Sequence, residues 1–102
     1  MALSLSTTRD AGTIIVGISG DVDLSTVAEV NNAMLAAVDD ADATVVVADL
    51  AAVTFIDSAG INTLLKSRRL ADERGRGFRV TNATGIVRDV LDMTGVLDHL
   101  SG

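Results

Sequence analysis

The segment Phe55-Ile56-Asp57-Ser58-Ala59-Gly60-Ile61 decides how this sequence folds. An apolar run ends there at an acid and a hydroxyl, and apolar residues then follow at helical spacing from Ile61 onward. This change of pattern predicts a strand followed at once by a helix whose N-terminus carries Asp57 and Ser58. Either side chain could cap the helix, because both accept hydrogen bonds from first-turn N–H groups. A helix N-terminus also favours negative charge, so a phosphate would be tolerated on Ser58.

The composition narrows the class of protein to expect. The 102 residues include no Cys, Trp or Tyr, are 48% apolar, and carry a net charge of -6. This length is typical of one domain, which we take as residues 1–102. The negative charge argues against binding to nucleic acid or to anionic membranes. The lack of Cys excludes disulfides and thiolate metal sites, and nothing in the sequence indicates a cofactor or a metal.

Two features of the sequence bear on where the protein works. Residues 1–6 alternate between polar and apolar positions and lack the basic start and apolar stretch of a signal peptide. No run approaches the roughly 20 apolar residues that a membrane span needs. We therefore expect a cytoplasmic protein.

The N-terminal part of the chain predicts a hairpin followed by a helix. Residues 3–5 and 13–18 have strand patterns and are separated by a short turn, which indicates an antiparallel pair. Thr26 and Glu29 have the spacing of a capping box. Apolar residues then recur at helical intervals until residues 39–40, where this helix should end.

Beyond that helix, strand and helix patterns alternate. The elements expected are a strand at residues 44–48 that is buried on both faces, a helix from Ser58 to about Gly75, a strand at residues 77–81, a helix from Thr84 to Gly95, and one more turn at residues 96–100. Strands connected through helices form parallel pairs. The sequence therefore predicts a single α/β domain with a small mixed four-stranded sheet, an N-terminal hairpin and about four helices.

Acidic side chains follow the predicted strands. Asp21 and Asp23 end the second strand, Asp49 ends the third, and Asp57 with Ser58 comes shortly afterwards. Parallel strands place their carboxyl ends along one edge of a sheet, where ligands usually bind. We therefore expect these carboxylates to lie near the Ser58 hydroxyl.

Three segments of the sequence resemble the STAS domain family, and within it the bacterial anti-sigma factor antagonists. They are residues 20–23 (Gly-Asp-Val-Asp), residues 53–61 around the Asp-Ser-Ala-Gly motif, and residues 87–96 (Val-Arg-Asp-Val-Leu-Asp-Met-Thr-Gly-Val). The second segment is the specific one, and together the three span nearly the whole chain. The resemblance implies a small mixed sheet with helices, and a role in binding a protein partner rather than in catalysis.

The resemblance also implies a phosphorylation switch. Antagonists of this family bind an anti-sigma factor that is also a serine kinase, and the sigma factor is thereby released. The kinase uses ATP to phosphorylate the serine that matches Ser58, and a metal-dependent serine/threonine phosphatase reverses the reaction. On this basis the partner-binding residues are Asp23, Asp57, Ser58, Ala59 and Gly60. A phosphate adds about -1.5 to -2 charges beside acidic neighbours, so we expect it to block binding by charge and bulk without refolding.

One departure from the family pattern limits the possible acceptors. Ala59 stands where many relatives have a second serine, which removes the nearest alternative. Thr54 precedes the turn and Thr63 lies inside the predicted helix, so both are weaker candidates. Some members of the family are never phosphorylated, and a non-phosphorylated scaffold or a nucleotide-binding module is therefore the alternative function.

Two enzyme-like interpretations compete with partner binding. Residues 58–60 match the latter part of a nucleophile elbow, but Ile56 stands where that motif needs Gly, and the only His is His99. A receiver-like phosphoacceptor would use the clustered acids to bind Mg²⁺. That site also needs a Lys near the sheet edge, and the lone Lys66 lies inside a predicted helix.

Positive charge is concentrated in one part of the chain. Six of the eight basic residues lie in the second predicted helix and just after it, namely Lys66, Arg68, Arg69, Arg74, Arg76 and Arg79. We interpret them as a solvated helix face whose basic end complements the helix dipole. A surface for an acidic partner is the alternative.

Overall fold

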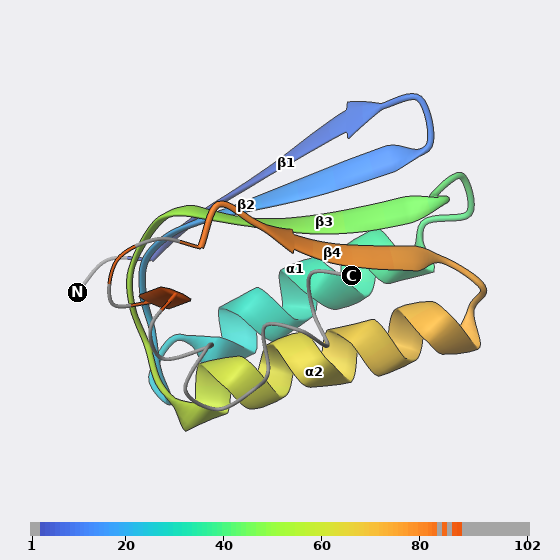
Figure 1. The fold of residues 1–102 in the computed structure, drawn as a ribbon. Helices are drawn as coiled ribbons and strands as arrows, with labels where there is room; N and C mark the ends of the chain where they lie inside the picture. The colour runs from blue at the N-terminus through green and yellow to red at the C-terminus, as the bar shows by residue number, and fades with distance from the viewer. Residues whose placement is uncertain (1–2, 84, 86, 89–102) are drawn as a thin grey trace.

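Four strands and two helices make up the described part of the chain, residues 3–83, 85, 87 and 88 of a computed structural model. In chain order they are β1 (Ser4–Asp10), β2 (Thr13–Val22), α1 (Val27–Asp39), β3 (Val45–Ile56), α2 (Ser58–Glu73) and β4 (Gly77–Thr81). Figure 1 shows the strands as one curved layer with both helices on the same face. We call the face turned away from α1 and α2 the outer face.

The sheet has the mixed topology that the sequence predicted. Its strand order is β1-β2-β3-β4, with β1 antiparallel to β2 and the other two pairs parallel. Asp10 pairs with Thr13 across a two-residue turn, in which Ala11 has a φ of 51°. The predicted N-terminal hairpin and the crossover connections through α1 and α2 are both confirmed.

The core lies between the helices and the inner face of the sheet. Alternate residues of β2, such as Ile14, Val16 and Ile18, are buried, as expected for a strand with one covered face. The largest side chains with almost no exposure are Met34, Leu50, Leu64, Val16, Val22, Val30, Val38, Val46 and Val87. The core is therefore built mainly from aliphatic side chains, as expected for a sequence with few aromatic residues.

The prediction of about four helices differs from the structure, in which the described residues form two. Of the helix predicted from Thr84 to Gly95, only residues 85, 87 and 88 are described, and these three are helical. The further turn predicted at residues 96–100 lies outside the described residues. The helix predicted to end near Gly75 ends at Glu73, and Gly75 follows with a φ of 70°.

The strand predicted at residues 44–48 is longer than expected. β3 runs without interruption from Val45 to Ile56, so Asp49 lies within the strand rather than at its end. Val46, Val47 and Ala48 are buried, as predicted. The sequence predicted a strand end at Asp49 because a strand was assumed to stop at an acid. A polar side chain on the outer face of the sheet does not interrupt strand pairing, so β3 continues through Asp49.

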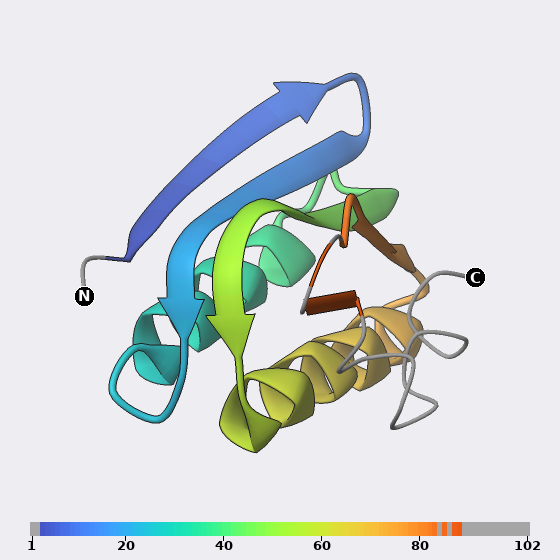
Figure 2. The same cartoon turned by 60° about the vertical axis from the view of Figure 1, so that its left-hand side comes forward.

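Irregular pairing bends β2 and β3 near their carboxyl ends. The β2–β3 register shifts between Gly17 and Ser19 and again between Gly20 and Asp21, where Gly20 has a φ of 102°. Such bulges increase the local bend and twist of a strand. Figure 2 shows the result, in which both strands curve over and end side by side near the first turns of α1 and α2.

Candidate functional site

The candidate site lies where β2 and β3 end together. Val22 pairs with Ile56, and the N–H of Asp57 donates a hydrogen bond of 3.1 Å to the carbonyl of Val22. Asp23 and Asp57 each follow directly after one member of this pair. The structure therefore brings these two predicted site residues to adjacent strand ends (Figure 2).

Asp57 is the residue that caps α2. Its carboxylate accepts a hydrogen bond of 3.1 Å from the N–H of Gly60, and Ser58 is the first helical residue, with an exposed side chain. Within the described residues, the N–H groups of Ser58 and Ala59 have no hydrogen-bond acceptor. Two backbone donors and the positive end of the helix dipole thus lie beside an exposed hydroxyl, an arrangement that can accommodate a phosphate.

Gly60 allows the first turn of α2 to lie against the two strand ends. A Cβ atom at this position would lie 2.6 Å from Cγ1 of Ile56 and 2.7 Å from Cγ1 of Val22. Both neighbours are buried and β-branched, so neither can move aside easily. The resemblance assigned Gly60 to the partner surface, and the structure places it in a buried position directly beneath that surface.

A closed network of hydrogen bonds organises the loop from Asp23 to Thr26. Oδ1 of Asp23 accepts from the hydroxyl of Ser25 at 2.6 Å and from its N–H at 2.9 Å. The hydroxyl of Thr26 accepts from the N–H of Asp23 at 3.0 Å and donates to the carbonyl of Asp21 at 2.8 Å. Through Oδ1, the carboxylate of Asp23 therefore stabilises the conformation of its own loop.

The prediction of a capping box at the start of α1 is wrong. Thr26 is the N-cap residue, but its side chain caps no N–H of the helix. Its hydroxyl bonds instead to the loop that precedes the helix, at Asp21 and Asp23. Glu29 has the spacing from Thr26 that a capping box requires, but the Thr26 hydroxyl forms its hydrogen bonds with Asp21 and Asp23 instead.

Loss of the Ser25 hydroxyl should raise the pKa of Asp23. The hydrogen bond from that hydroxyl is the largest influence lowering the pKa of the Asp23 carboxyl below its ordinary value of 3.8; partial desolvation opposes it. We expect Ser25→Ala to move the pKa upward toward that value, as measured by NMR titration of the carboxyl carbon. Ser4→Ala, on the edge strand, should leave the pKa unchanged, and an unchanged value in Ser25→Ala would refute the assignment.

The same interaction has a defined effect on stability. A lowered pKa in the folded state means that the folded protein binds this proton less readily than the unfolded chain does. The stabilising contribution of Asp23 is therefore complete above the ordinary Asp pKa and is lost as the pH falls through the lower value of the folded state.

The other hydroxyls considered as phosphate acceptors are less available than Ser58. Thr54 is exposed, but its hydroxyl donates a hydrogen bond of 2.7 Å to Oδ1 of Asp21. Thr63 lies within α2 and is buried. Ser58 is exposed and has no recorded side-chain hydrogen bond among the described residues.

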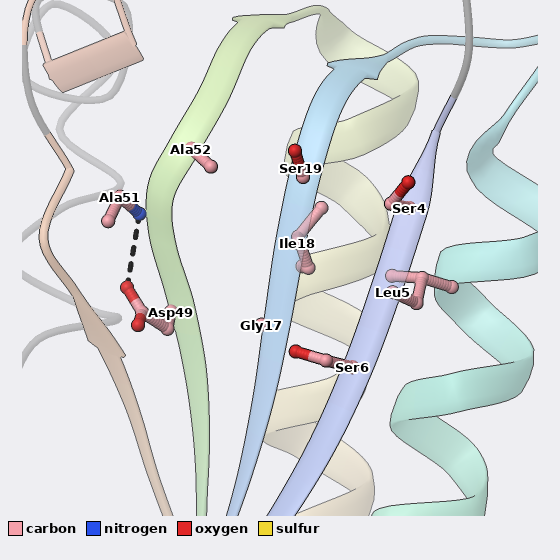
Figure 3. A pocket seen from close by; sticks show the side chains of 9 residues that line it. All are labelled: Ser4, Leu5, Ser6, Gly17, Ile18, Ser19, Asp49, Ala51 and Ala52. Carbon is pink, nitrogen blue, oxygen red and sulfur yellow. Dashed lines mark hydrogen bonds between the residues drawn. The ribbon is translucent and has the colours of Figure 1, made fainter.

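Asp49 does not join the other predicted acids. It lies in the middle of β3, where Oδ1 accepts hydrogen bonds from the N–H of Ala51 at 3.0 Å and from the side chain of Asn82 at 2.9 Å. Figure 3 shows it at a hollow of about 270 Å³ over β1, β2 and β3, together with Ser6 and Ser19. Asp49 is therefore separate from the acids at the strand ends and cannot contribute to a receiver-like site there.

Several of the basic residues hold the opposite end of the molecule together. Arg74 forms an ion pair with Asp39, and Arg9 forms one with Asp40. Arg76 donates a hydrogen bond of 2.8 Å to the carbonyl of Asp40. These contacts join the end of α1 to the hairpin and to the end of α2. The sequence predicted only a solvated helix face, whereas Arg74 and Arg76 also connect separate elements of the fold.

Sequence reasoning overlooked Leu24, which is 80% exposed in the loop between β2 and α1. Phe55 is 44% exposed one residue before the end of β3. The sequence could have indicated an exposed Leu24, because this residue is apolar but lies in a polar loop, outside the helical repeat of apolar residues.

The described residues show neither a metal-binding cluster nor a membrane-spanning helix. Among the described residues, no group of three or more His, Cys, Asp or Glu is arranged to hold a metal ion. In the same part of the chain, no helix has the length and apolar character to cross a membrane. His99, on which a catalytic triad would depend, lies outside the described residues.

The fold has close counterparts among solved structures. An anti-sigma factor antagonist from Mycobacterium paratuberculosis is 25% identical with a TM-score of 0.87, and the match covers 97% of this chain and 83% of that one. SpoIIAA, an anti-sigma factor antagonist solved in its unphosphorylated form, is 19% identical with a TM-score of 0.79, covering 97% and 85% of the two chains. The phosphorylated form of SpoIIAA, from Bacillus, matches with 21% identity and a TM-score of 0.67, covering 93% and 85%.

The same fold occurs inside a larger protein. The murine anion transporter Slc26a9 is 20% identical with a TM-score of 0.75, and the match covers 89% of this chain but 15% of the transporter. No match was found among curated protein sequences. The family model for the STAS domain matches residues 4–101. Since that match covers nearly all of the 102 residues, this chain belongs to the STAS domain family.

Proposed function

We propose that this chain, as a single STAS domain over residues 1–102, is an anti-sigma factor antagonist switched off by phosphorylation of Ser58. In the unphosphorylated state it binds an anti-sigma factor in the cytoplasm, and the sigma factor is released. The observation that carries this proposal is the exposed Ser58 hydroxyl at the first position of α2, at the joint end of β2 and β3. The likeness to the mycobacterial antagonist supports it.

The partner-binding surface comprises Asp23, Asp57, Ser58 and Ala59, with Gly60 beneath it. Asp57 fixes the start of α2, and the Asp23 carboxylate shapes the neighbouring loop. Gly60 lets the helix lie close to the strand ends. The surface is therefore assembled from the loop before α1 and the N-terminus of α2, which meet at the paired ends of β2 and β3.

Phosphorylation changes this surface by charge and bulk. The kinase transfers the γ-phosphoryl group of ATP to Oγ of Ser58, the hydroxyl gives up its proton, and ADP leaves. The product adds about -1.5 to -2 charges next to Asp57. The N–H groups of the first turn of α2 stabilise the phosphate, so the domain keeps its fold while the bulky, strongly hydrated phosphate prevents the partner surface from fitting against it.

The partner proteins catalyse the chemical steps of the switch. The domain contributes an acceptor hydroxyl and a binding surface, and the anti-sigma factor supplies the kinase activity. A metal-dependent serine/threonine phosphatase hydrolyses the phosphoserine and restores the binding-competent form. On this account the domain is not an enzyme and requires no cofactor of its own.

Mass spectrometry can test the assignment of the acceptor. The protein is incubated with ATP and a purified anti-sigma factor kinase from the source organism, and the phosphorylated residue is mapped. We expect an acid-stable phosphate on Ser58 and none on the Ser58→Ala variant. Phosphate on Thr54, or an acid-labile phosphate on an Asp, would contradict the proposal.

The alternative is a STAS domain that is not phosphorylated and serves as a scaffold or nucleotide-binding module. It is favoured by the match to one segment of a much larger transporter. Absence of phosphate after incubation with ATP and the kinase, together with failure of the unmodified protein to bind that kinase, would support this alternative.

A further inference from the structure

We propose that Leu24 and Phe55 are apolar anchors that insert into a recess on the anti-sigma factor, and that basic side chains of the partner border this recess. This inference rests on the proposed function and assigns to it two residues that are not among the partner-binding residues implied by the family resemblance. Leu24 and Phe55 are the two large apolar side chains exposed at the carboxyl ends of the described strands, at 80% and 44%. We call them, together with Ser58, the anchor face.

The strand register places these residues at or just beyond adjacent strand ends. Phe55 pairs with Asp21 and Ile56 pairs with Val22, while Leu24 follows two residues after Val22. The two anchors thus come from adjacent strand ends (Figure 2), and Ser58 follows Phe55 by three residues at the first position of α2. One docked protein could contact all three side chains.

Hydrogen bonds on both sides of Leu24 restrain the loop that carries it. On either side of it, Asp23 bonds to Ser25 through its carboxylate, and its carbonyl accepts from the N–H groups of Thr26 at 3.0 Å and Val27 at 2.8 Å. A leucine on a restrained loop loses less conformational freedom when it binds than one on a mobile loop, and this preorganisation favours tighter binding.

The charges around the anchors indicate the chemistry of the partner. Asp21, Asp23 and Asp57 accompany them, and within the described residues none of the three takes part in an ion pair. Their negative charge is available to basic groups on another protein. A second copy of this chain would instead bring the same acids together with a net charge of -6 on each molecule, which disfavours self-association.

The structure also contains a matched control residue. Leu35 is 37% exposed on α1, eight residues beyond Val27 and so about 12 Å along the helix from its first residue. Leu35→Ser removes the same side chain as Leu24→Ser but leaves the anchor face intact. Any loss of binding that follows only from a general decrease in surface hydrophobicity would appear in both variants.

Calorimetric titration with the purified anti-sigma factor kinase tests the proposal. The unsubstituted protein is the parent, all titrations are run without ATP so that no phosphate is transferred, and thermal unfolding verifies that each variant is folded. We expect Leu24→Ser and Phe55→Ser each to weaken the affinity by about tenfold or more, since a buried Leu or Phe side chain commonly contributes that much. Leu35→Ser should bind within about twofold of the parent, a difference too small to reflect loss of a buried contact.

The outcomes separate this inference from the function on which it rests. If the parent binds tightly and Leu24→Ser and Phe55→Ser bind equally well, the anchors are refuted while the antagonist function stands. If the parent does not bind the kinase at all, both are refuted. If sedimentation shows a dimer of the parent that Leu24→Ser abolishes, the anchors face a second copy of the chain, which also overturns the proposal.

Discussion

Replacing Ser58 with Asp is expected to weaken binding to the anti-sigma factor by about 100-fold or more, because a carboxylate buried in an interface without a partner costs several kcal/mol. The new carboxylate would stand beside Asp57 at the centre of the proposed surface. Ser58→Ala removes only an exposed hydroxyl with no recorded side-chain partner, so it should bind within a few-fold of wild type, because an exposed polar atom contributes little. Titration calorimetry on the three proteins measures the difference.

A charge placed elsewhere provides the control for this comparison. Thr7 is exposed on β1 opposite Val16, six residues before the end of β2 and so about 20 Å along the strand from the site. Thr7→Asp adds the same charge to the molecule without entering the proposed surface. Equal losses of affinity in Thr7→Asp and Ser58→Asp would show that overall charge is responsible, and would count against a local switch.

Replacing Gly60 with Ala is expected to lower the free energy of unfolding by about 1–3 kcal/mol, the usual cost of overpacking a core. Ordinarily the exchange of Gly for Ala stabilises a helix by up to about 1 kcal/mol. Here the added Cβ would lie 2.6 Å from Ile56 and 2.7 Å from Val22, which outweighs that gain. Denaturation in urea, followed by circular dichroism, measures the change.

Asn62→Ala is the matched helix variant. Asn62 lies two residues further along α2 and is exposed, so its replacement should change stability by a few tenths of a kcal/mol in the stabilising direction. A Gly60→Ala protein as stable as wild type would show that the first turn of α2 can move away from the strand ends. The glycine of the motif would then need another explanation.

The parts of the site that could be predicted from the sequence depend on neighbours in the chain. Asp57 and Ser58 were assigned to a helix N-terminus because a cap and its helix are consecutive, and the structure has that arrangement. The pairing of two parallel strands through a helix was predictable in the same way. Local signals of this kind require no knowledge of the rest of the fold.

The errors arose where the sequence pattern does not show which of several possible partners a side chain contacts, or which face of an element is covered. The Thr26 hydroxyl was expected to cap α1, but the carbonyl of Asp21 and the N–H of Asp23 occupy it. Asp49 was taken as a strand end because the pattern does not show which face of β3 is covered. The steric need for Gly60 depends on Ile56 and Val22 meeting across two strands, and no spacing in the sequence indicates that contact.

The most direct test of the switch compares one protein before and after modification. The chain is phosphorylated at Ser58 by the kinase, purified, and titrated against the anti-sigma factor beside the unmodified protein and a sample treated afterwards with the phosphatase. We predict tight binding by the unmodified and dephosphorylated samples, and an affinity at least about 100-fold lower for the phosphorylated one. Equal affinities for all three samples would contradict the proposed switch.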